Sequence, residues 1–289
     1  MKHAVTLVLA FMLLATMVYA EAWKLDSDIN MSLTQSAYSD SWAGTELSNI
    51  TWLASSNSTA EKQLKPWLKN NTTLKLAFGQ THLQKTDALG DKYWNKPEKS
   101  TDKIDLESVF RFTTQAWVDP FLAGRLESQF IDLSDPSLTR IVNPLLLTET
   151  AGVIRTFVEN DNSLLTTRLG AAFRERLDRE VMQSSGEREL ESTVDGGLEM
   201  VSEFKHAFTP TEANFKSRLQ VYQALFNSKS DDLNEDWKSP DMVWENVFTT
   251  KLWGLLSANL SFETRYEKEA VHKLQWKQIL GLGISYSLL

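Results

Sequence analysis

The stretch Leu255–Glu267, with the sequence LLSANLSFETRYE, decides the fold. Its even positions from 256 to 266 carry Leu, Ala, Leu, Phe, Thr and Tyr, whereas its odd positions from 257 to 267 carry Ser, Asn, Ser, Glu, Arg and Glu. Successive side chains of a β-strand point to opposite faces of a sheet, so this stretch predicts a strand with one apolar and one polar face. An amphipathic helix would instead repeat its apolar residues every three to four positions.

The same alternation recurs along the whole chain. Twelve segments carry it, starting near residues 23, 47, 67, 103, 120, 148, 163, 194, 213, 242, 255 and 274. Each is roughly 10 to 15 residues long, which suits a tilted membrane strand better than a strand of a soluble sheet. The periodicity therefore predicts an all-β protein, a closed antiparallel up-and-down transmembrane β-barrel of about 12 strands.

The connections between these segments alternate in length. Long polar connections are expected at 36–46, 81–102, 132–147, 176–193 and 226–241, and short ones at 59–66, 115–119, 159–162, 207–212 and 253–254. In outer-membrane barrels the short turns face the periplasm and the long loops face outward. Because the strand number is even, both termini are expected on the periplasmic side.

Composition and the first residues indicate where the protein resides. The chain has 289 residues, a formal net charge of −8 and no Cys, which excludes disulfide scaffolds and thiolate metal sites and argues against nucleic acid as a partner. Residues 1–20 combine a short polar start, an apolar run and the small-residue pattern ending at Ala20 that is typical of a secretory signal peptide. We expect cleavage after Ala20, a barrel over residues 21–289 and a place in the bacterial outer membrane.

The polar face of the predicted barrel is rich in charges of both signs. A sheet in a bilayer must close so that no backbone edge stays unpaired, and its polar face then lines the lumen. The residues expected to form a lumen charge network are Asp105, Glu107, Arg111, Arg125, Glu127, Arg155, Arg168, Lys216, Arg218, Glu263 and Arg265. The same face is expected to hold Glu149, Glu199, Glu203, Glu245, Glu267, Lys69, Lys75, Arg174, Lys205 and Lys251.

Two interpretations of this charged face are open. It could line a narrow conduit, or it could form structural salt bridges around trapped water. Twelve strands enclose a lumen only modestly wider than a filled eight-stranded barrel, so long side chains from facing walls would occupy much of it. We therefore expect locked ion pairs and small or absent conductance, with any selectivity set by Lys216 and Arg218.

Tryptophan placement is consistent with a membrane. Indole rings prefer the interface between apolar core and headgroups. The expected interface aromatics are Trp23, Trp67, Trp117 and Trp253 at periplasmic strand ends, and Trp276 near an outer end.

Sequence motifs for catalysis, cofactors or metals are nearly absent. The histidines after residue 20, His82, His206 and His272, lack metal-ligand spacing, and there is no phosphate loop or Gly-x-Ser-x-Gly elbow. We expect a non-enzymatic barrel without cofactor or metal, either a narrow channel or an envelope structural protein. One alternative is a lipase-like outer-membrane hydrolase, in which His82 would lie beside a lipid-facing Ser. Another is a soluble secreted barrel that binds a ligand with an inward apolar face.

The expected partners follow from this location. Outer-membrane lipids would surround the barrel, and acidic loop residues such as Glu187, Glu189 and Glu191 would meet lipopolysaccharide through bridging ions. Insertion would depend on the barrel-assembly machinery, although the last residue is Leu289 where Phe is typical.

Three short motifs resemble one known family. Gln35 followed by Trp42-Ala43-Gly44 is similar to the Gln…Asn-Trp-x-x-Gly-Gly opening of an uncharacterised family of outer-membrane β-barrel proteins from Bacteroidota-like bacteria, with Ser41 and Thr45 departing from it. The segments 147–152 and 274–286 resemble the middle and closing strands of that family. The resemblance spans most of the chain after residue 20 and implies fold and location only.

Overall fold

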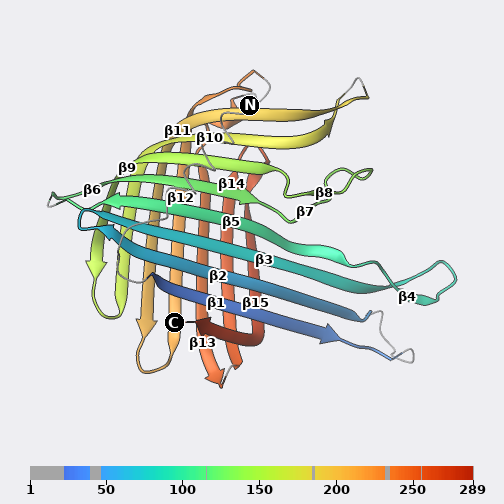
Figure 1. Cartoon of the computed structure of the whole chain (residues 1–289). Helices are drawn as coiled ribbons and strands as arrows, with labels where there is room; N and C mark the ends of the chain where they lie inside the picture. The colour runs from blue at the N-terminus through green and yellow to red at the C-terminus, as the bar shows by residue number, and fades with distance from the viewer. Residues whose placement is uncertain are drawn as a thin grey trace.

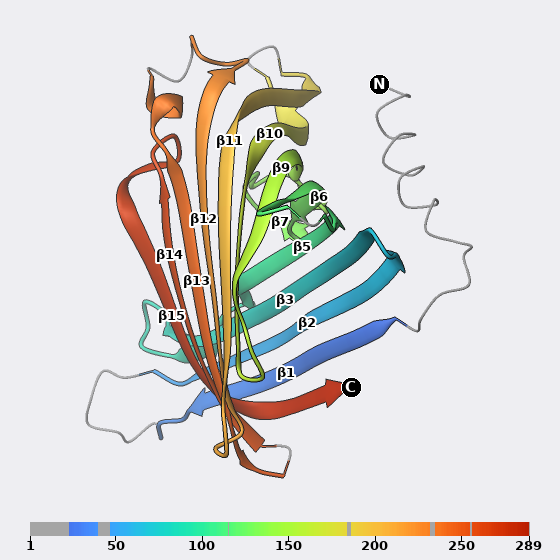
Figure 2. The same cartoon turned by 90° about the vertical axis from the view of Figure 1, so that its left-hand side faces the viewer.

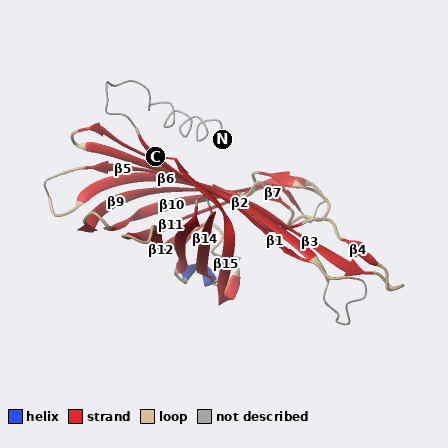
Figure 3. Cartoon of the chain, turned by 90° about the horizontal axis from the view of Figure 1, so that it is seen from below, coloured by secondary structure: helices blue, strands red, loops and turns tan. Residues whose placement is uncertain are grey.

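The computed structural model describes residues 23–39, 47–114, 116–183, 186–231, 235–254 and 256–288. The expected signal peptide, the Trp42-Ala43-Gly44 motif and Leu289 lie outside these residues. Among the described residues there is no helix that is both long and apolar enough to cross a membrane. A 3-10 turn, η1 (Asp236–Lys238), lies near β12 (Figure 3).

Twelve antiparallel strands close into a ring. Each pairs with its neighbours in chain order, β15 pairs with β1, and the β2–β3 pairing completes the circle. The strands of the ring are β1 (Lys24–Ser36), β2 (Asn49–Lys65), β3 (Leu68–Thr86), β5 (Glu98–Phe112), β6 (Asp119–Ser128), β9 (Leu145–Glu159), β10 (Ser163–Met182), β11 (Arg188–Phe208), β12 (Ala213–Asn227), β13 (Asp241–Trp253), β14 (Leu256–Glu267) and β15 (Val271–Leu288). The predicted all-β, closed, up-and-down barrel of about twelve strands is confirmed.

Three short strands lie outside the ring. β4 (Lys92–Trp94) pairs with the C-terminal end of β3. β7 (Ile131–Asp132) pairs with β8 (Arg140–Ile141) inside the connection from β6 to β9. The described ends of the chain, at the start of β1 and the end of β15, lie on the side of the short turns, as expected for an even strand number.

One expected loop is instead strand. The sequence predicts a long connection over 176–193, but β10 and β11 continue as a hairpin and leave only residues 183–187 between them. Leu177 pairs with Ser192 and Asp178 with Glu191 in this extension. The apolar–polar alternation is lost there, because charged residues occupy both faces of the part of this hairpin that extends past the ends of the neighbouring strands.

The two faces of the ring differ in polarity. Large apolar side chains are exposed on the outer face, including Leu25, Met31 and Leu33 on β1, each at least 59% exposed. The inner face is polar and buried, with Asp105 at 3% and Arg125 at 8% exposure. The described strands therefore have the reverse of the arrangement required by the soluble-binder alternative, in which the apolar face turns inward.

The ring is flattened rather than circular. Strands β1 to β6 cross strands β12 to β15 at a steep angle (Figures 1 and 2). Steep tilt is normal in closed sheets. Here it brings the inner faces of two walls close enough for their side chains to meet, as the contacts described below demonstrate.

The connection over 129–144 is a folded unit docked against β10. Asn143 is fully buried and its side-chain amide donates hydrogen bonds to Asp132 Oδ2 and Asp178 Oδ1, both at 2.8 Å. Its side-chain oxygen accepts a hydrogen bond from the Arg179 backbone N–H at 2.9 Å. Arg140 pairs with the same two carboxylates, at 2.6 Å and 2.9 Å. The connection is thus held by a satisfied polar core rather than by apolar packing.

Replacing Asn143 with Ala should release this connection. The substitution removes one hydrogen bond from each of two carboxylates, which keep Arg140, and leaves the Arg179 backbone N–H without its partner, which costs about 1–3 kcal/mol for that group. We expect rapid proteolytic nicking within 129–144 in folded Asn143→Ala, measured by mass spectrometry, and slow nicking in the unmodified protein. Ser137→Ala, which removes two exposed side-chain hydrogen bonds, with Asp135 and Arg188, and leaves the buried contacts of Asn143 in place, is the matched control. Equal nicking of all three would contradict the assignment.

The same connection should loosen in acid. Burial raises the pKa of Asp132, but hydrogen bonds from Ser134 and Asn143 and the charge of Arg140 outweigh it and hold that pKa below its usual value. A depressed pKa contributes stability above the usual Asp value of about 3.9 and loses it as pH falls through the folded-state value. Pepsin nicking of 129–144 should rise over that window in the unmodified protein. In Asp132→Asn, which cannot titrate, this rise should be reduced; an unchanged rise would argue against Asp132 as the cause.

Candidate functional site

The centre of the lumen is crossed by ion pairs that join strands from opposite walls. Glu107 on β5 receives hydrogen bonds from Arg168 on β10 and from Arg218 on β12, the latter at 3.1 Å and 3.3 Å to its two oxygens. None of these strands is a neighbour of another in the ring. The three side chains are between 5% and 12% exposed, so the triad is largely removed from solvent.

A second crossing begins at Arg125 on β6. Its guanidinium donates to both oxygens of Asp105 on the neighbouring β5, at 2.9 Å and 2.8 Å. It also donates to Gln220 Oε1 on β12 at 2.5 Å, across the lumen. Gln220 in turn donates to Glu199 at 2.8 Å, and Glu199 accepts from Thr150 at 2.9 Å. This chain of hydrogen bonds links β5, β6, β12, β11 and β9.

A third crossing is centred on Glu245 of β13. Its carboxylate accepts from Lys75 of β3 at 2.7 Å and from Lys103 of β5 at 2.5 Å. We call the side chains of these three crossings the bridging network: Asp105, Glu107, Arg125, Thr150, Arg168, Glu199, Arg218, Gln220, Glu245, Lys75 and Lys103.

The surroundings make these pairs strong. Phe121, Ile154 and Val201 are at most 8% exposed and form apolar parts of the same inner face. The Arg168 guanidinium lies 5.8 Å from the centre of the Phe121 ring. Opposite charges in such a poorly solvated space attract far more strongly than in bulk water, and removing one partner of a buried pair typically costs about 3–5 kcal/mol. The network therefore ties the two walls together.

Other inner charges pair away from this centre. Arg174 of β10 contacts Asp195 at 2.8 Å and Asp241 at 3.0 Å, and its guanidinium lies 3.5 Å from the centre of the Tyr222 ring. Lys216 of β12 pairs with Asp28 of β1 at 2.8 Å. These contacts extend the charged section toward both ends of the ring.

The expected lumen residues are distributed unevenly. Five of them meet in the bridging network: Asp105, Glu107, Arg125, Arg168 and Arg218. Glu127 lies 3.0 Å from Arg125 on the same strand. Arg111 contacts Asp119 at 2.6 Å on the neighbouring strand, so it does not cross the lumen. Glu263 pairs with Arg265 at 3.3 Å and with Lys277 at 3.1 Å on the β14–β15 side.

The placement of Arg155 in the lumen is wrong. On β9 the inner positions are the even ones, because Thr150 contacts Glu199 and Thr156 contacts Arg111. Arg155 therefore lies on the outer face, where its guanidinium stacks 4.3 Å from the Trp117 ring and donates to the Trp117 carbonyl at 2.6 Å. Glu149 is outward for the same reason. The strand has polar residues on its inner face and mixed residues outside, so alternation alone assigned the faces in reverse.

Lys103 is the main network residue missing from the expectation. It shares the inward parity of Asp105 and lies at the start of the predicted segment near 103, so applying the alternation to that first residue would have found it. The pairing of Glu245 with Lys75 and Lys103 has no signal in the sequence, because it depends on how the two walls approach.

The expected interface tryptophans are all exposed, Trp23 least and Trp253 most. Trp67 stacks on Phe112 with ring centres 6.1 Å apart, and Trp276 stacks on Phe262 at 6.3 Å. Trp67, Trp117 and Trp253 lie at or near the short turns, whereas Trp276 lies toward the other end of β15.

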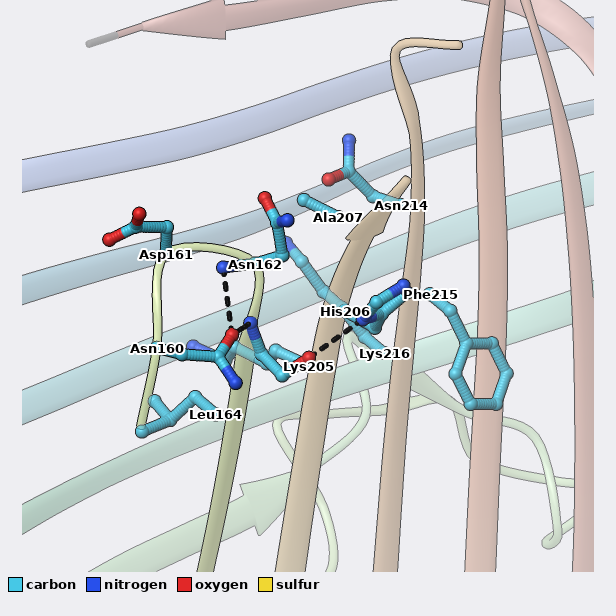
Figure 4. A pocket seen from close by; sticks show the side chains of 11 residues that line it. Asn160, Asp161, Asn162, Leu164, Lys205, His206, Ala207, Asn214, Phe215 and Lys216 are labelled. Carbon is cyan, nitrogen blue, oxygen red and sulfur yellow. Dashed lines mark hydrogen bonds between the residues drawn. The ribbon is translucent and has the colours of Figure 1, made fainter. Parts of the chain in front are cut away.

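A Ser–His hydrogen bond lies outside the lumen. Ser163 at the start of β10 is 2.8 Å from Nδ1 of His206, its partner on β11 (Figure 4). His206 also contacts the rings of Phe204 and Phe208. A shallow cavity of about 230 Å³ beside them is lined by the 160–162 turn, Lys205 and Lys216. His82, the expected hydrolase residue, pairs with Ile50 instead of a Ser.

The described residues contain no group of three or more acidic or histidine side chains arranged to hold a metal ion. The inner face of the ring carries fixed cations and carboxylates that are paired with one another.

Residues 33–132, about a third of the chain, match a family model described as "Protein of unknown function (DUF3078)". The chain matches no curated protein. Among solved structures it is similar to an outer membrane channel (COG4313) from Pseudomonas putida F1, with 11% identity, a TM-score of 0.44, and coverage of 94% of this chain and 96% of that one.

Two autotransporter domains are also similar. The translocator domain of NalP from Neisseria meningitidis has 10% identity and a TM-score of 0.36, with 99% of this chain and 94% of that one covered. The β domain of BrkA from Bordetella has 11% identity and a TM-score of 0.37, with 93% and 100% covered. Likeness at this level assigns no function to this chain.

Proposed function

We propose that this protein is an integral outer-membrane β-barrel whose lumen is a narrow channel held shut by the bridging network. Its place in a membrane is supported by the ring of paired strands, which leaves its outer apolar face exposed, and by the aromatic residues near the strand ends. In this arrangement the short turns and both termini face the periplasm. Outer-membrane lipids and lipopolysaccharide are its surroundings, and the barrel-assembly machinery inserts it.

The observation that carries the closed state is the triad of Glu107, Arg168 and Arg218. It joins three strands that are not neighbours, so its side chains must span the lumen rather than lie along one wall. Two cations on one buried carboxylate leave a net positive charge, which Glu203, 3.3 Å from Arg218, offsets. The balanced charges favour a locked structure over an open aqueous path. Transport through this barrel therefore requires the network to part.

Conductance in planar bilayers tests this proposal. The unmodified protein should give little current above the protein-free bilayer, because the network fills the axis. Changing Glu107, Arg168 and Arg218 together to Ala removes the triad without leaving a lone buried charge, and should raise conductance severalfold.

The matched control changes the same three residues to Met. Met keeps most of the side-chain volume, and buried ion triads can be replaced by apolar residues without loss of folding. The Met variant should conduct much less than the Ala variant. A large, porin-like current in the unmodified protein would refute the proposal, as would an Ala variant that folds, shown by heat-modifiable gel mobility, yet stays closed.

The hydrogen bond between Ser163 and His206 supports a second candidate, a lipid hydrolase. A Ser activated by a His is the usual nucleophile of such enzymes. However, among the described residues no carboxylate is hydrogen-bonded to His206, and its ring packs between two phenylalanines. An aromatic-belt position near the periplasmic turns accounts for these contacts.

A serine-directed fluorophosphonate probe distinguishes the two roles. We expect no labelling of the purified barrel and no release of fatty acid from phospholipid vesicles. Ser163→Ala is the control. Labelling and lipid release that are both lost in this variant would establish the hydrolase instead.

A further inference from the structure

The ring is closed by its shortest ladder of long strands. β1 and β15 pair only from Ser27–Leu288 to Ser32–Gly283. In the described structure, residues 33–36 of β1 pair with β2 alone, and residues 271–282 of β15 pair with β14 alone. Figure 2 shows the C-terminal end of β15 lying along β1 while the rest of β15 rises steeply away from it. The two strands therefore splay apart above Ser32.

Side-chain exposure agrees with an unpaired edge. On β15, the outer Leu274 and Trp276 are exposed, and so are the inner Gln275 and Lys277. Elsewhere in the ring the inner residues of long strands are mostly buried or half-buried. Thr34, which faces inward on β1, is exposed as well.

In the membrane location proposed above, this edge lies at membrane depth. Leu33, Leu280 and Leu282 face outward and are 62–69% exposed, as expected for side chains that contact hydrocarbon. Backbone groups facing hydrocarbon need partners, and unpaired backbone is tolerated there only where it lines water. The splayed part of the seam must then be continuous with the aqueous side of the lumen.

In the described structure, the crossing ion pair that reaches β1, Lys216 with Asp28, lies at the closed part of the seam, and the bridging network does not reach the splayed part. The bridging network joins β3, β5, β6, β9, β10, β11, β12 and β13. The pairs made by β2 and β14 run to neighbouring strands, as between Glu61 and Lys69 or Glu263 and Lys277. The inner side chains next to the seam are small or polar. A Cβ added to Gly281 would be in van der Waals contact with Ser32 at 3.5 Å, so the two strands are still close there and separate beyond that point.

We propose that the splayed β1–β15 seam is a lateral portal through which single-chain amphiphiles pass between the lumen and the bilayer. Its inner lip, with Ser32, Thr34 and Lys277, suits a polar headgroup. Its outer lip, with Leu33, Leu280 and Leu282, suits an apolar chain. The amphiphile would leave the lumen sideways between β1 and β15, while the bridging network still closes the path along the barrel axis. The proposal rests on the membrane location given above, but not on how the bridging network opens.

Cysteine pairs test the seam in a chain that has no Cys of its own. Extending the observed register pairs Thr34 with Gly281 in the splayed part, whereas Asn30 and Ser285 pair in the closed part. In proteoliposomes, Asn30→Cys/Ser285→Cys should form a disulfide readily. Thr34→Cys/Gly281→Cys should stay reduced and react with a charged, water-soluble maleimide. Disulfide formation by both pairs to the same extent would show that the seam is zipped and overturn the portal.

Transport provides the second readout. A fluorescent lysophospholipid is added to the solution outside the vesicles. It should enter the bilayer of proteoliposomes that contain the unmodified protein faster than it enters protein-free vesicles. A bis-maleimide bridge between Cys residues at 34 and 281 should abolish that acceleration, whereas the 30–285 disulfide should not; unchanged transfer with the bridge in place would overturn the proposal. Failure of the protein to co-float with lipid would instead refute the membrane location.

Discussion

A closed sheet gives every residue one of two surroundings, and the rest of this structure depends on that constraint. Once β15 pairs with β1 and β2 with β3, alternate side chains must lie inside a flattened ring. Charged residues on the inner face then have little water to solvate them, so each needs a partner of opposite sign. The partners come from the facing wall because the flattening brings that wall within reach of a Glu or Arg side chain. Glu107, with its two arginines, is the clearest product of this constraint.

Much of the fold could be predicted from the sequence because a two-residue period survives in most strands. The strand number, the direction of the chain and most short turns follow from it, as in 255–267. The connection predicted at 59–66 is an exception, because β2 continues to Lys65 and leaves only residues 66–67 as the turn. The upper part of the β10–β11 hairpin could not be predicted this way, because it rises above the ring and has no apolar face to preserve. Arg155 shows a related limit of the alternation. When the outer face of a strand carries Arg and Glu, the sequence of that strand alone does not show which face points into the lumen.

For the bridging network, the same reasoning predicts which residues face inward but not which of them are in contact. Which residues face inward follows from parity, and this places Asp105, Glu107 and Arg125 on one surface. Which of them touch depends on shear, tilt and flattening, none of which leaves a local signal. Arg111 and Glu107 lie on the same strand with the same parity, yet one pairs with its neighbour Asp119 and the other reaches across the ring. Long-range pairs such as Lys75 with Glu245 are properties of the closed shape.

Cross-linking two walls also has a mechanical consequence. An empty ring of strands can change its cross-section from oval to round at little cost, because its hydrogen-bonded ladders bend easily about their strand axes. Ion pairs at several positions along the barrel axis connect the two walls and hold the short diameter of the oval constant. The area that the barrel occupies in the plane of a bilayer is then nearly constant. Lateral pressure from the lipids acts on the ion pairs and does not deform the wall.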